Sequence, residues 1–217
     1  MTAPRHDIYA FIHKGLRAFM ANTLVRIGRV DPHDEAEFAE VAEELRALLH
    51  ICADHLKNEN EVIHAAMEAR RPGSSASVAA DHMQHAAAIG RLADLLERAA
   101  GSAEGTHALY HALGAFVAHN FDHMEEEETV HNAVLWATHS DDELRALEHT
   151  IVARHTPQEM SLALRWMLPH MNPAERAAML GGMRANAPAP VFEGALGLLR
   201  PLLGGRDWRK LCSALGL

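Results

Sequence analysis

Two pairs of residues have the spacing of metal ligands on a helix. His55 and Glu59 lie four positions apart in "HLKNE", and His123 and Glu127 repeat this spacing in "HMEEE". Because residues i and i+4 share one face of a helix, each pair directs a nitrogen and an oxygen donor to the same side. Mixed imidazole and carboxylate donors suit iron or manganese better than calcium or copper(I). The spacing therefore predicts a transition-metal site.

Both pairs interrupt an apolar stripe on the helix that carries them. The earlier stripe spans residues 41–66 in steps of three and four, and His55 and Glu59 occupy positions where a hydrophobic residue is expected. The later stripe is interrupted in the same way at His123 and Glu127. Its other members are Leu109, Leu113, Phe116, Asn120, Val130 and Val134. We expect both pairs to face the protein interior.

Histidines also interrupt the apolar faces of two further segments. His13 lies near the centre of the first face, in "IHKGLR", and His85 is central in the third, where Asp81 and His82 flank the face. A single buried histidine is usually a hydrogen-bonded core residue. Burying two carboxylates and several imidazoles together is costly without a common partner, and a pair of divalent or trivalent cations supplies that partner.

Other polar residues near the two pairs are predicted to lie outside the site. The remaining acidic and histidine side chains of the earlier helix are expected on its solvated face, namely His50, Asp54, Glu61 and His64. Glu125, Glu126 and Glu128 are expected to form a solvated flank. His119 and His131 lie at the two edges of the later apolar face, so we expect rim residues rather than ligands.

Long helices must position these residues. Ala, Leu, Glu, Arg and Met dominate long stretches with three-and-four spacing, so the predicted fold class is all-α. Breaker residues separate four predicted helices, over residues 7–27, 32–69, 77–100 and 106–137. Asp31 followed by Pro32 predicts the start of the second helix. Long helices joined by short loops favour antiparallel neighbours, which predicts an up-down four-helix bundle.

A C-terminal subdomain of short helices is predicted to follow the bundle. Three segments place a capping residue three positions before a glutamate, as in a capping box: "SDDE" (140–143), "TPQE" (156–159) and "NPAE" (172–175). Prolines and a glycine pair divide the rest into short elements. We therefore predict two domains, the bundle at residues 1–138 and a helical extension at residues 139–217.

Composition and charge limit the classes of function. The 217 residues include 17 histidines, and the net charge of −9 with scattered basic residues argues against nucleic acid as a partner. Cys52 and Cys212 form no CxxC motif, so neither a structural disulfide nor a thiolate zinc site is expected. The N-terminal "MTAPRHDIYAF" lacks an apolar run of signal-peptide length, and no segment offers the roughly 18 apolar residues of a membrane span. We expect a cytoplasmic protein without a membrane partner.

The placement of these residues on successive helices resembles the hemerythrin-like family, also called the HHE cation-binding family. The resemblance rests on His13, on the two His-x-x-x-Glu pairs and on "DHMQHAAAI" in the third helix, and it covers about residues 5–137. It implies a four-helix bundle that holds two iron ions in an oxo- or hydroxo-bridged di-iron centre, with manganese or zinc as alternative metals. By position, Glu59 and Glu127 would bridge the two ions.

The resemblance also assigns the remaining ligands. His13 and His55 would bind one iron, and His123 would bind the other together with a histidine of the third helix. That helix offers His82 and His85, and both stay candidates.

The function implied is that of a non-haem di-iron protein. It would bind or react with a small diatomic ligand, oxygen or nitric oxide, for sensing, carriage or protection against oxidative or nitrosative stress. Two rivals stay open: a di-metal peroxidase or oxidase on the same site, and a metal-storage or zinc-binding helical adaptor. The sequence leaves open whether the protein is an enzyme and what its oligomeric state is. The C-terminal helices are the candidate surface for a protein partner.

Overall fold

The computed structural model describes residues 5–217, and all regular structure in this part of the chain is helical. The all-α prediction is therefore confirmed. The first four residues lie outside the described residues; they belong to the predicted bundle domain and to the N-terminal stretch in which no signal peptide is expected. No described helix combines the length and the apolar character that crossing a membrane requires.

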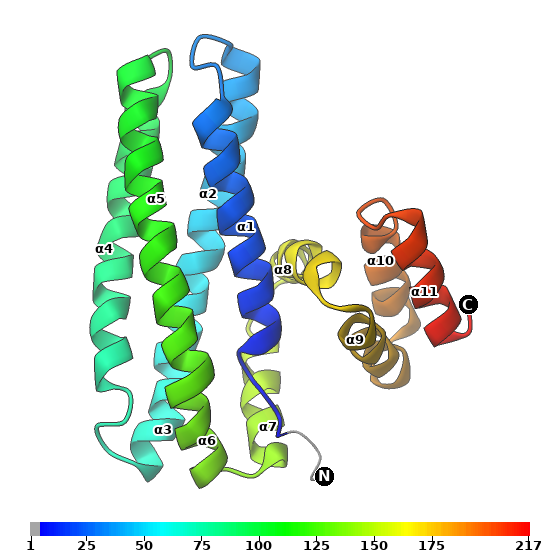
Figure 1. Ribbon diagram of the computed structural model, residues 1–217. Helices are drawn as coiled ribbons and strands as arrows, with labels where there is room; N and C mark the ends of the chain where they lie inside the picture. The colour runs from blue at the N-terminus through cyan, green and yellow to red at the C-terminus, as the bar shows by residue number, and fades with distance from the viewer. Residues whose placement is uncertain (1–4) are drawn as a thin grey trace. The chain divides into compact units, whose positions relative to one another are not determined.

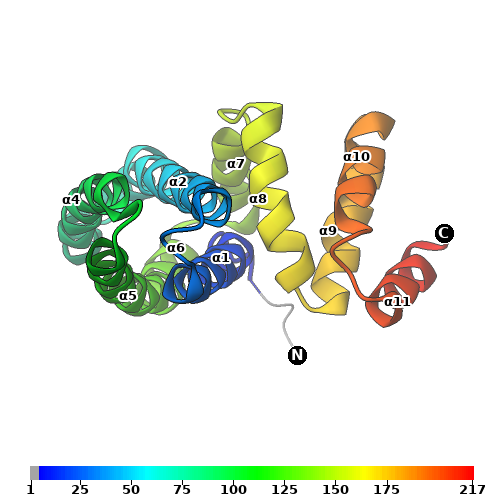
Figure 2. The same ribbon diagram turned by 90° about the horizontal axis from the view of Figure 1, so that it is seen from above.

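Four long helical stretches correspond to the four predicted helices. They are α1 (Ala10–Arg29); α2 (Glu35–Asn58) continued by η1 (Glu59–His64) and α3 (Ala65–Arg70); α4 (Ala76–Ala99); and α5 (Ala103–Glu126) continued by η2 (Glu127–His131) and α6 (Asn132–Thr138). Their ends differ from the predicted ends by at most three residues. Figures 1 and 2 show α1, α2, α4 and α5 side by side in a helical bundle.

The predicted start of α2 at Asp31 is wrong. Asp34 caps the helix instead, because its side chain accepts two backbone N–H groups of the first turn. The carboxylate of Asp31 accepts the backbone N–H of His33 (2.9 Å), which closes a separate turn just before the helix. A proline after an aspartate therefore marked a turn here rather than the first helical residue.

The π-helical segments η1 and η2 change the phase of the two helices that contain them. Each segment has i→i+5 hydrogen bonds, so it acts as an insertion relative to an α-helix and rotates the residues that follow. Val130, predicted on the apolar stripe, is 51% exposed, whereas His131 is fully buried. Such segments are rare and occur frequently at functional sites. Here they begin at Glu59 and at Glu127.

An apolar cluster fixes the start of α1 against the end of the bundle that carries η1 and η2. Its buried members are Ile8, Tyr9, Ile63, Met67, Val134, Leu135 and Leu144. Full burial of one large apolar side chain contributes roughly 1.5–3 kcal/mol. Arg5 adds hydrogen bonds to the backbone oxygens of Trp136 (2.8 Å) and His139 (2.7 Å). Residues far apart in the sequence are thereby held next to the predicted metal ligands.

Contacts divide the described chain into two compact units. The first comprises residues 5–10 and 19–154 and includes α7 (Asp141–Val152). The second comprises Phe11–Ala18 and residues 155–217. Its helices are α8 (Pro157–His170), α9 (Pro173–Asn186), α10 (Ala189–Leu199) and α11 (Gly205–Leu215). The domain boundary between residues 138 and 139 stays a prediction.

Capping boxes start three of the short helices, as the sequence predicts. The pairs are Ser140 with Glu143, Thr156 with Glu159, and Asn172 with Glu175. In each pair the first side chain accepts the backbone N–H of the glutamate, and the glutamate accepts the backbone N–H of the capping residue. Loss of one such cap typically costs about 1 kcal/mol.

The second unit has a hydrophobic core of its own. The buried members are Leu164, Leu168, Met171, Leu180, Phe192, Ala195, Leu199, Leu203 and Leu211. The buried guanidinium of Arg176 donates hydrogen bonds to the backbone oxygens of Leu168 (2.7 Å) and Met171 (2.7 Å).

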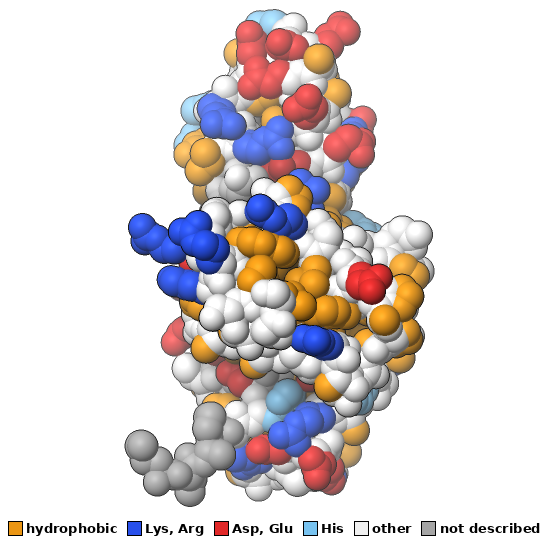
Figure 3. All heavy atoms as spheres, turned by 90° about the vertical axis from the view of Figure 1, so that its right-hand side faces the viewer, with side chains coloured by type: hydrophobic (Ala, Val, Ile, Leu, Met, Phe, Trp, Pro, Cys, Tyr) orange, Lys and Arg blue, Asp and Glu red, His pale blue; other side chains and the backbone are white. Residues whose placement is uncertain are grey.

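Figure 3 shows one face of the molecule, on which hydrophobic side chains gather beside Lys and Arg side chains.

Candidate metal centre

Two buried carboxylates stand at the centre of the site. Glu59 and Glu127 are 1% and 0% exposed. The Nε2 atom of His55 lies 3.1 Å from Oε1 of Glu59, and the Nε2 atom of His123 lies 3.4 Å from Oε2 of Glu127. Both His-x-x-x-Glu pairs thus turn their donor atoms toward each other in the interior, which agrees with the direction that their helical phase predicts.

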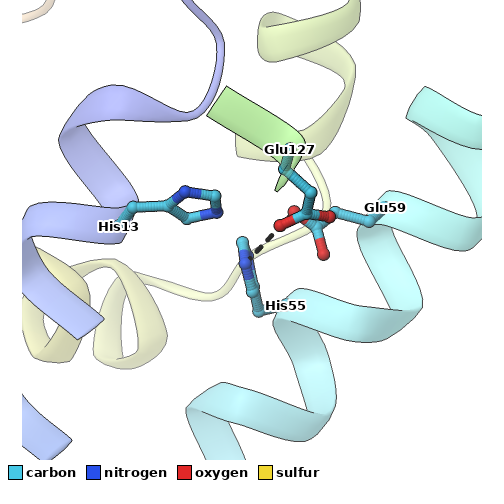
Figure 4. A group of neighbouring side chains, drawn as sticks. All are labelled: His13, His55, Glu59 and Glu127. Carbon is cyan, nitrogen blue, oxygen red and sulfur yellow. Dashed lines mark ion pairs between the residues drawn. The ribbon is translucent and has the colours of Figure 1, made fainter. Parts of the chain in front are cut away.

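A first group of donors unites both carboxylates with two histidines. It consists of His13, His55, Glu59 and Glu127, whose ligand atoms all lie within 4.8 Å of one another. Figure 4 shows the two imidazoles directed toward the carboxylates from separate helices. His13 is completely buried. These are the residues that the family resemblance assigns to one ion and its bridging carboxylates.

A second group shares the same two carboxylates and adds two other histidines. It consists of Glu59, His82, His123 and Glu127, all of them buried, with ligand atoms again within 4.8 Å. The Nε2 atom of His82 lies 3.1 Å from Nε2 of His123 and 3.4 Å from Oε2 of Glu59. Of the two histidines predicted on the third helix, His82 is therefore the one that joins the carboxylates.

The histidines of this second group are oriented by partners on their outer nitrogens. The Nδ1 atom of His82 lies 2.9 Å from the side-chain oxygen of Asn60, and the Nδ1 atom of His123 lies 3.5 Å from a carboxylate oxygen of Asp81. A metal-binding histidine commonly gives its second N–H to such a partner, which leaves the other nitrogen as the donor. Burial alone would lower the pKa of His123, but the carboxylates of Glu127, Glu59 and Asp81 together outweigh burial and raise it.

His85 is the other predicted ligand of the third helix. It belongs to neither of the two donor groups that share Glu59 and Glu127. It is buried, and its Nε2 atom lies 2.6 Å from Nδ1 of His119. Its ring also meets the edge of Phe116, with centroids 5.9 Å apart. Burial, followed by the neighbouring histidines, lowers the pKa of His85 to about 3. The geometry thus pairs His85 with His119, and its role as a ligand stays a prediction.

Two histidines that the sequence assigned to the surface and the rim are buried instead. His64 is 5% exposed and His131 is 0% exposed, and both form a third group of ligand atoms with Glu127. In an α-helix, a residue five positions after Glu59 would point about 140° away from it. The i→i+5 hydrogen bonds of η1 bring such a residue back toward the face of Glu59. A histidine one turn after each glutamate was the signal that could have revealed them.

The donor atoms fit a pair of transition-metal ions. Each of the first two groups offers two imidazole nitrogens and shares two carboxylates, a mixture that suits iron, manganese or zinc. None of the three donor groups found among the described residues contains a cysteine, so the site offers no thiolate ligand. Ions placed between the carboxylates would neutralise charges that are otherwise costly to bury.

A cavity of about 360 Å³ reaches the second group from the side of α2 and α4. Its lining residues are Ala53, Leu56, Lys57, Asn60, Glu61, His82, Ala86 and Ile89. Asn60 and His82 belong both to this lining and to the hydrogen bond described above. A small molecule in the cavity would therefore meet the side of the candidate centre formed by His82.

Comparison with known families supplies an independent result. The family model described as the hemerythrin HHE cation binding domain matches residues 6–135, which is more than half of the chain. Neither the curated proteins nor the solved structures include a match. The matched range contains every residue of the three donor groups. The chain belongs to the hemerythrin HHE cation-binding family.

Proposed function

We propose that the chain is a non-haem di-iron protein that binds or reacts with a small diatomic ligand, oxygen or nitric oxide. In this proposal the long helices form an up-down four-helix bundle around the two ions. The supporting observation is that two donor groups share Glu59 and Glu127, while each contributes two histidines of its own. Two bridging carboxylates flanked by two pairs of imidazoles match the needs of two adjacent cations.

The donor count supports reactivity with a small ligand. Each ion would have two histidines and a share of two carboxylates, which leaves coordination positions open on iron. When bound, a di-iron pair supplies electrons for reduction of oxygen and vacant positions for a diatomic molecule. The protein supplies the enclosure, because the carboxylates and the imidazoles of His13, His82 and His123 are at most 3% exposed.

The cavity beside His82 is the proposed route for the ligand. The cavity has an apolar wall, through which oxygen and nitric oxide, as small apolar molecules, can pass to the centre. This wall is formed by Ala53, Leu56, Ala86 and Ile89. Asn60 stands where this route meets the centre and holds the Nδ1 atom of His82. This hydrogen bond keeps Nε2 of His82 directed at the carboxylates. Asn60 therefore orients the metal-binding histidine and also lines the proposed entrance.

Metal analysis combined with an absorption spectrum tests the proposal. Protein purified in air from cells supplied with iron should contain two irons per chain and should absorb in the near ultraviolet through oxo-bridged ferric ions. The reduced protein, kept free of oxygen, should lose these bands and should bind nitric oxide with a new spectrum. A colourless protein that carries only zinc would remove the basis for diatomic chemistry and would favour the metal-storage or adaptor function.

A di-metal peroxidase or oxidase on the same site is the second candidate. The observation that favours it is the size of the cavity at His82, since about 360 Å³ admits a small organic substrate as well as a diatomic molecule. Sustained turnover of peroxide with an electron donor would favour this enzyme. Stoichiometric binding without turnover would favour a sensor or carrier.

A further inference from the structure

His64, His131 and Glu127 form a third group of donors, which has Glu127 in common with the first two groups. Their ligand atoms lie within 4.8 Å of one another, and all three residues are at least nine-tenths buried. None of the family assignments made above uses the two histidines. Their burial therefore needs a separate explanation, because an imidazole costs free energy to bury unless its polar atoms are satisfied.

Each of the two histidines has an unsatisfied ring nitrogen. The Nε2 atoms of His64 and His131 are buried, and neither has a hydrogen-bond partner among residues 5–217. Leaving one buried polar atom unsatisfied costs about 1–3 kcal/mol. Two such atoms beside a buried carboxylate therefore lower the stability of the fold, unless they coordinate a cation.

The surroundings hold both rings in place. The Nδ1 atom of His131 lies 3.3 Å from the hydroxyl of Tyr9, which leaves Nε2 as the ring nitrogen without a partner. The ring of His64 stacks on His82, with centroids 4.9 Å apart and planes inclined by 13°. It also meets the edge of the His131 ring at 5.2 Å. A partner on the outer nitrogen and a packed ring are the features that orient metal-binding histidines.

We infer that His64, His131 and Glu127 form a third cation position, which takes one divalent transition-metal ion such as Fe²⁺, Co²⁺ or Zn²⁺. Two histidines and one carboxylate with further positions open are the donor set of many non-haem Fe(II) sites. Nitrogen donors approach such an ion to about 2.0–2.1 Å, so shifts of about an ångström close the group around it.

Counting Co²⁺ ions on the apoprotein tests this inference. The full chain also carries an exposed pair, His107 and His111, whose Nε2 atoms are 3.1 Å apart and could bind Co²⁺ adventitiously. The reference protein is therefore the His107→Ala/His111→Ala variant. Equilibrium dialysis should give three ions per chain for this reference, and two after His64→Ala or His131→Ala is added.

A replacement that keeps a ligand provides the positive control. His64→Cys supplies a thiolate in place of the imidazole, so it should retain the third ion and add a sulfur-to-cobalt charge-transfer band. Circular dichroism monitors folding. If an alanine variant unfolds, His64→Gln gives the same reading, because glutamine keeps most of the side-chain volume and its hydrogen-bonding groups but is a poor ligand.

The outcomes separate this inference from the proposed di-iron function. An unchanged ion count in the His64 and His131 variants, or only two ions in the reference, overturns the third position. One ion in the reference that disappears with His64→Ala upholds the third position and contradicts the di-metal pair. A decrease of one ion together with a charge-transfer band in His64→Cys is the result expected.

Discussion

Glu59 and Glu127 occupy equivalent positions on two different helices. Each follows a histidine by four residues, each is the first residue of a π-helical segment, and each belongs to both donor groups of the candidate centre. Each carboxylate therefore has an imidazole one turn before it, from His55 or His123. A second imidazole follows it in the π-helical segment, from His64 or His131.

Removing a carboxylate that both donor groups share should lower the number of bound ions more than removing one histidine does. Glu127→Ala takes a donor from both groups, so it should abolish binding of the ion pair. His123→Ala takes a donor only from the second group, so it should weaken mainly one ion. Plasma emission analysis of the purified variants, with protein concentration from amino-acid analysis, gives the ion count per chain.

The matched control lies two residues away on the same helix. Glu125 is exposed, and Glu125→Ala should leave the ion count unchanged. Equal loss of metal in the Glu125, His123 and Glu127 variants would mean that overall negative charge, rather than the inward pair, holds the ions.

The hydrogen bond between Asn60 and His82 should tune the second ion. Asn60→Ala removes the partner of Nδ1 on His82 (2.9 Å), and loss of such outer partners typically weakens metal affinity by roughly 10–100-fold. Competition with a chelator of known affinity should therefore show one weakened ion and one unchanged ion. Lys57→Ala, which lines the same cavity without that hydrogen bond, is the control and should change neither.

The helices were predictable because they depend on local patterns. Apolar residues recur every three or four positions, and the capping boxes at Ser140, Thr156 and Asn172 use three-residue spacings that can be seen in any sequence. The inward direction of His55 and His123 followed from the same periodicity. These features require no knowledge of which residues meet across the bundle.

The third donor group was not predictable from an α-helical phase. A π-helical turn leaves no simple signature, so an α-helical wheel placed His64, five residues after Glu59, on the surface. His131 comes four residues after Glu127, and the wheel placed it at the rim of the apolar face. The choice between His82 and His85 was also open, because it depends on the position of α4 relative to α2 and α5. Long-range packing decides such details.

Neutralising one shared carboxylate should stabilise the metal-free protein while it removes the metal. Glu59 is 1% exposed, and the imidazoles of His55 (3.1 Å) and His82 (3.4 Å) offset the cost of burying its charge less than a divalent cation does. Glu59→Gln should therefore raise the unfolding free energy of the apoprotein by roughly 1–3 kcal/mol, the usual range for relief of a buried polar group. Urea denaturation in the presence of a chelator measures this change.

The same variant should lose the stabilisation that metal gives the wild type. A ligand present at 100 times its dissociation constant stabilises the native state by about 2.7 kcal/mol. Added Fe²⁺ or Co²⁺ should therefore raise the melting temperature of the wild type and leave that of Glu59→Gln nearly unchanged. A less stable Glu59→Gln apoprotein would show that Glu59 has a structural role independent of metal.

Acid should weaken the start of α7 through Glu143. Hydrogen bonds from Arg70 (2.5 Å) and from the backbone N–H of Ser140 (2.8 Å) lower the pKa of this carboxyl from 4.5 to about 2. Because the folded pKa lies below the unfolded one, the contribution to stability is fully present above about pH 4.5. It is lost as the pH falls from there toward 2.

Glu143→Gln isolates this contribution. The difference in unfolding free energy between wild type and Glu143→Gln, measured on apoproteins by urea denaturation, should be constant between pH 5 and 8 and should shrink between about pH 4.5 and 2. The exposed Glu125→Gln variant serves as the control, and its difference from wild type should stay small at every pH. A Glu143 difference that grows on acidification would mean that the carboxyl binds its proton more readily in the folded state, opposite to what the contacts with Arg70 and Ser140 require.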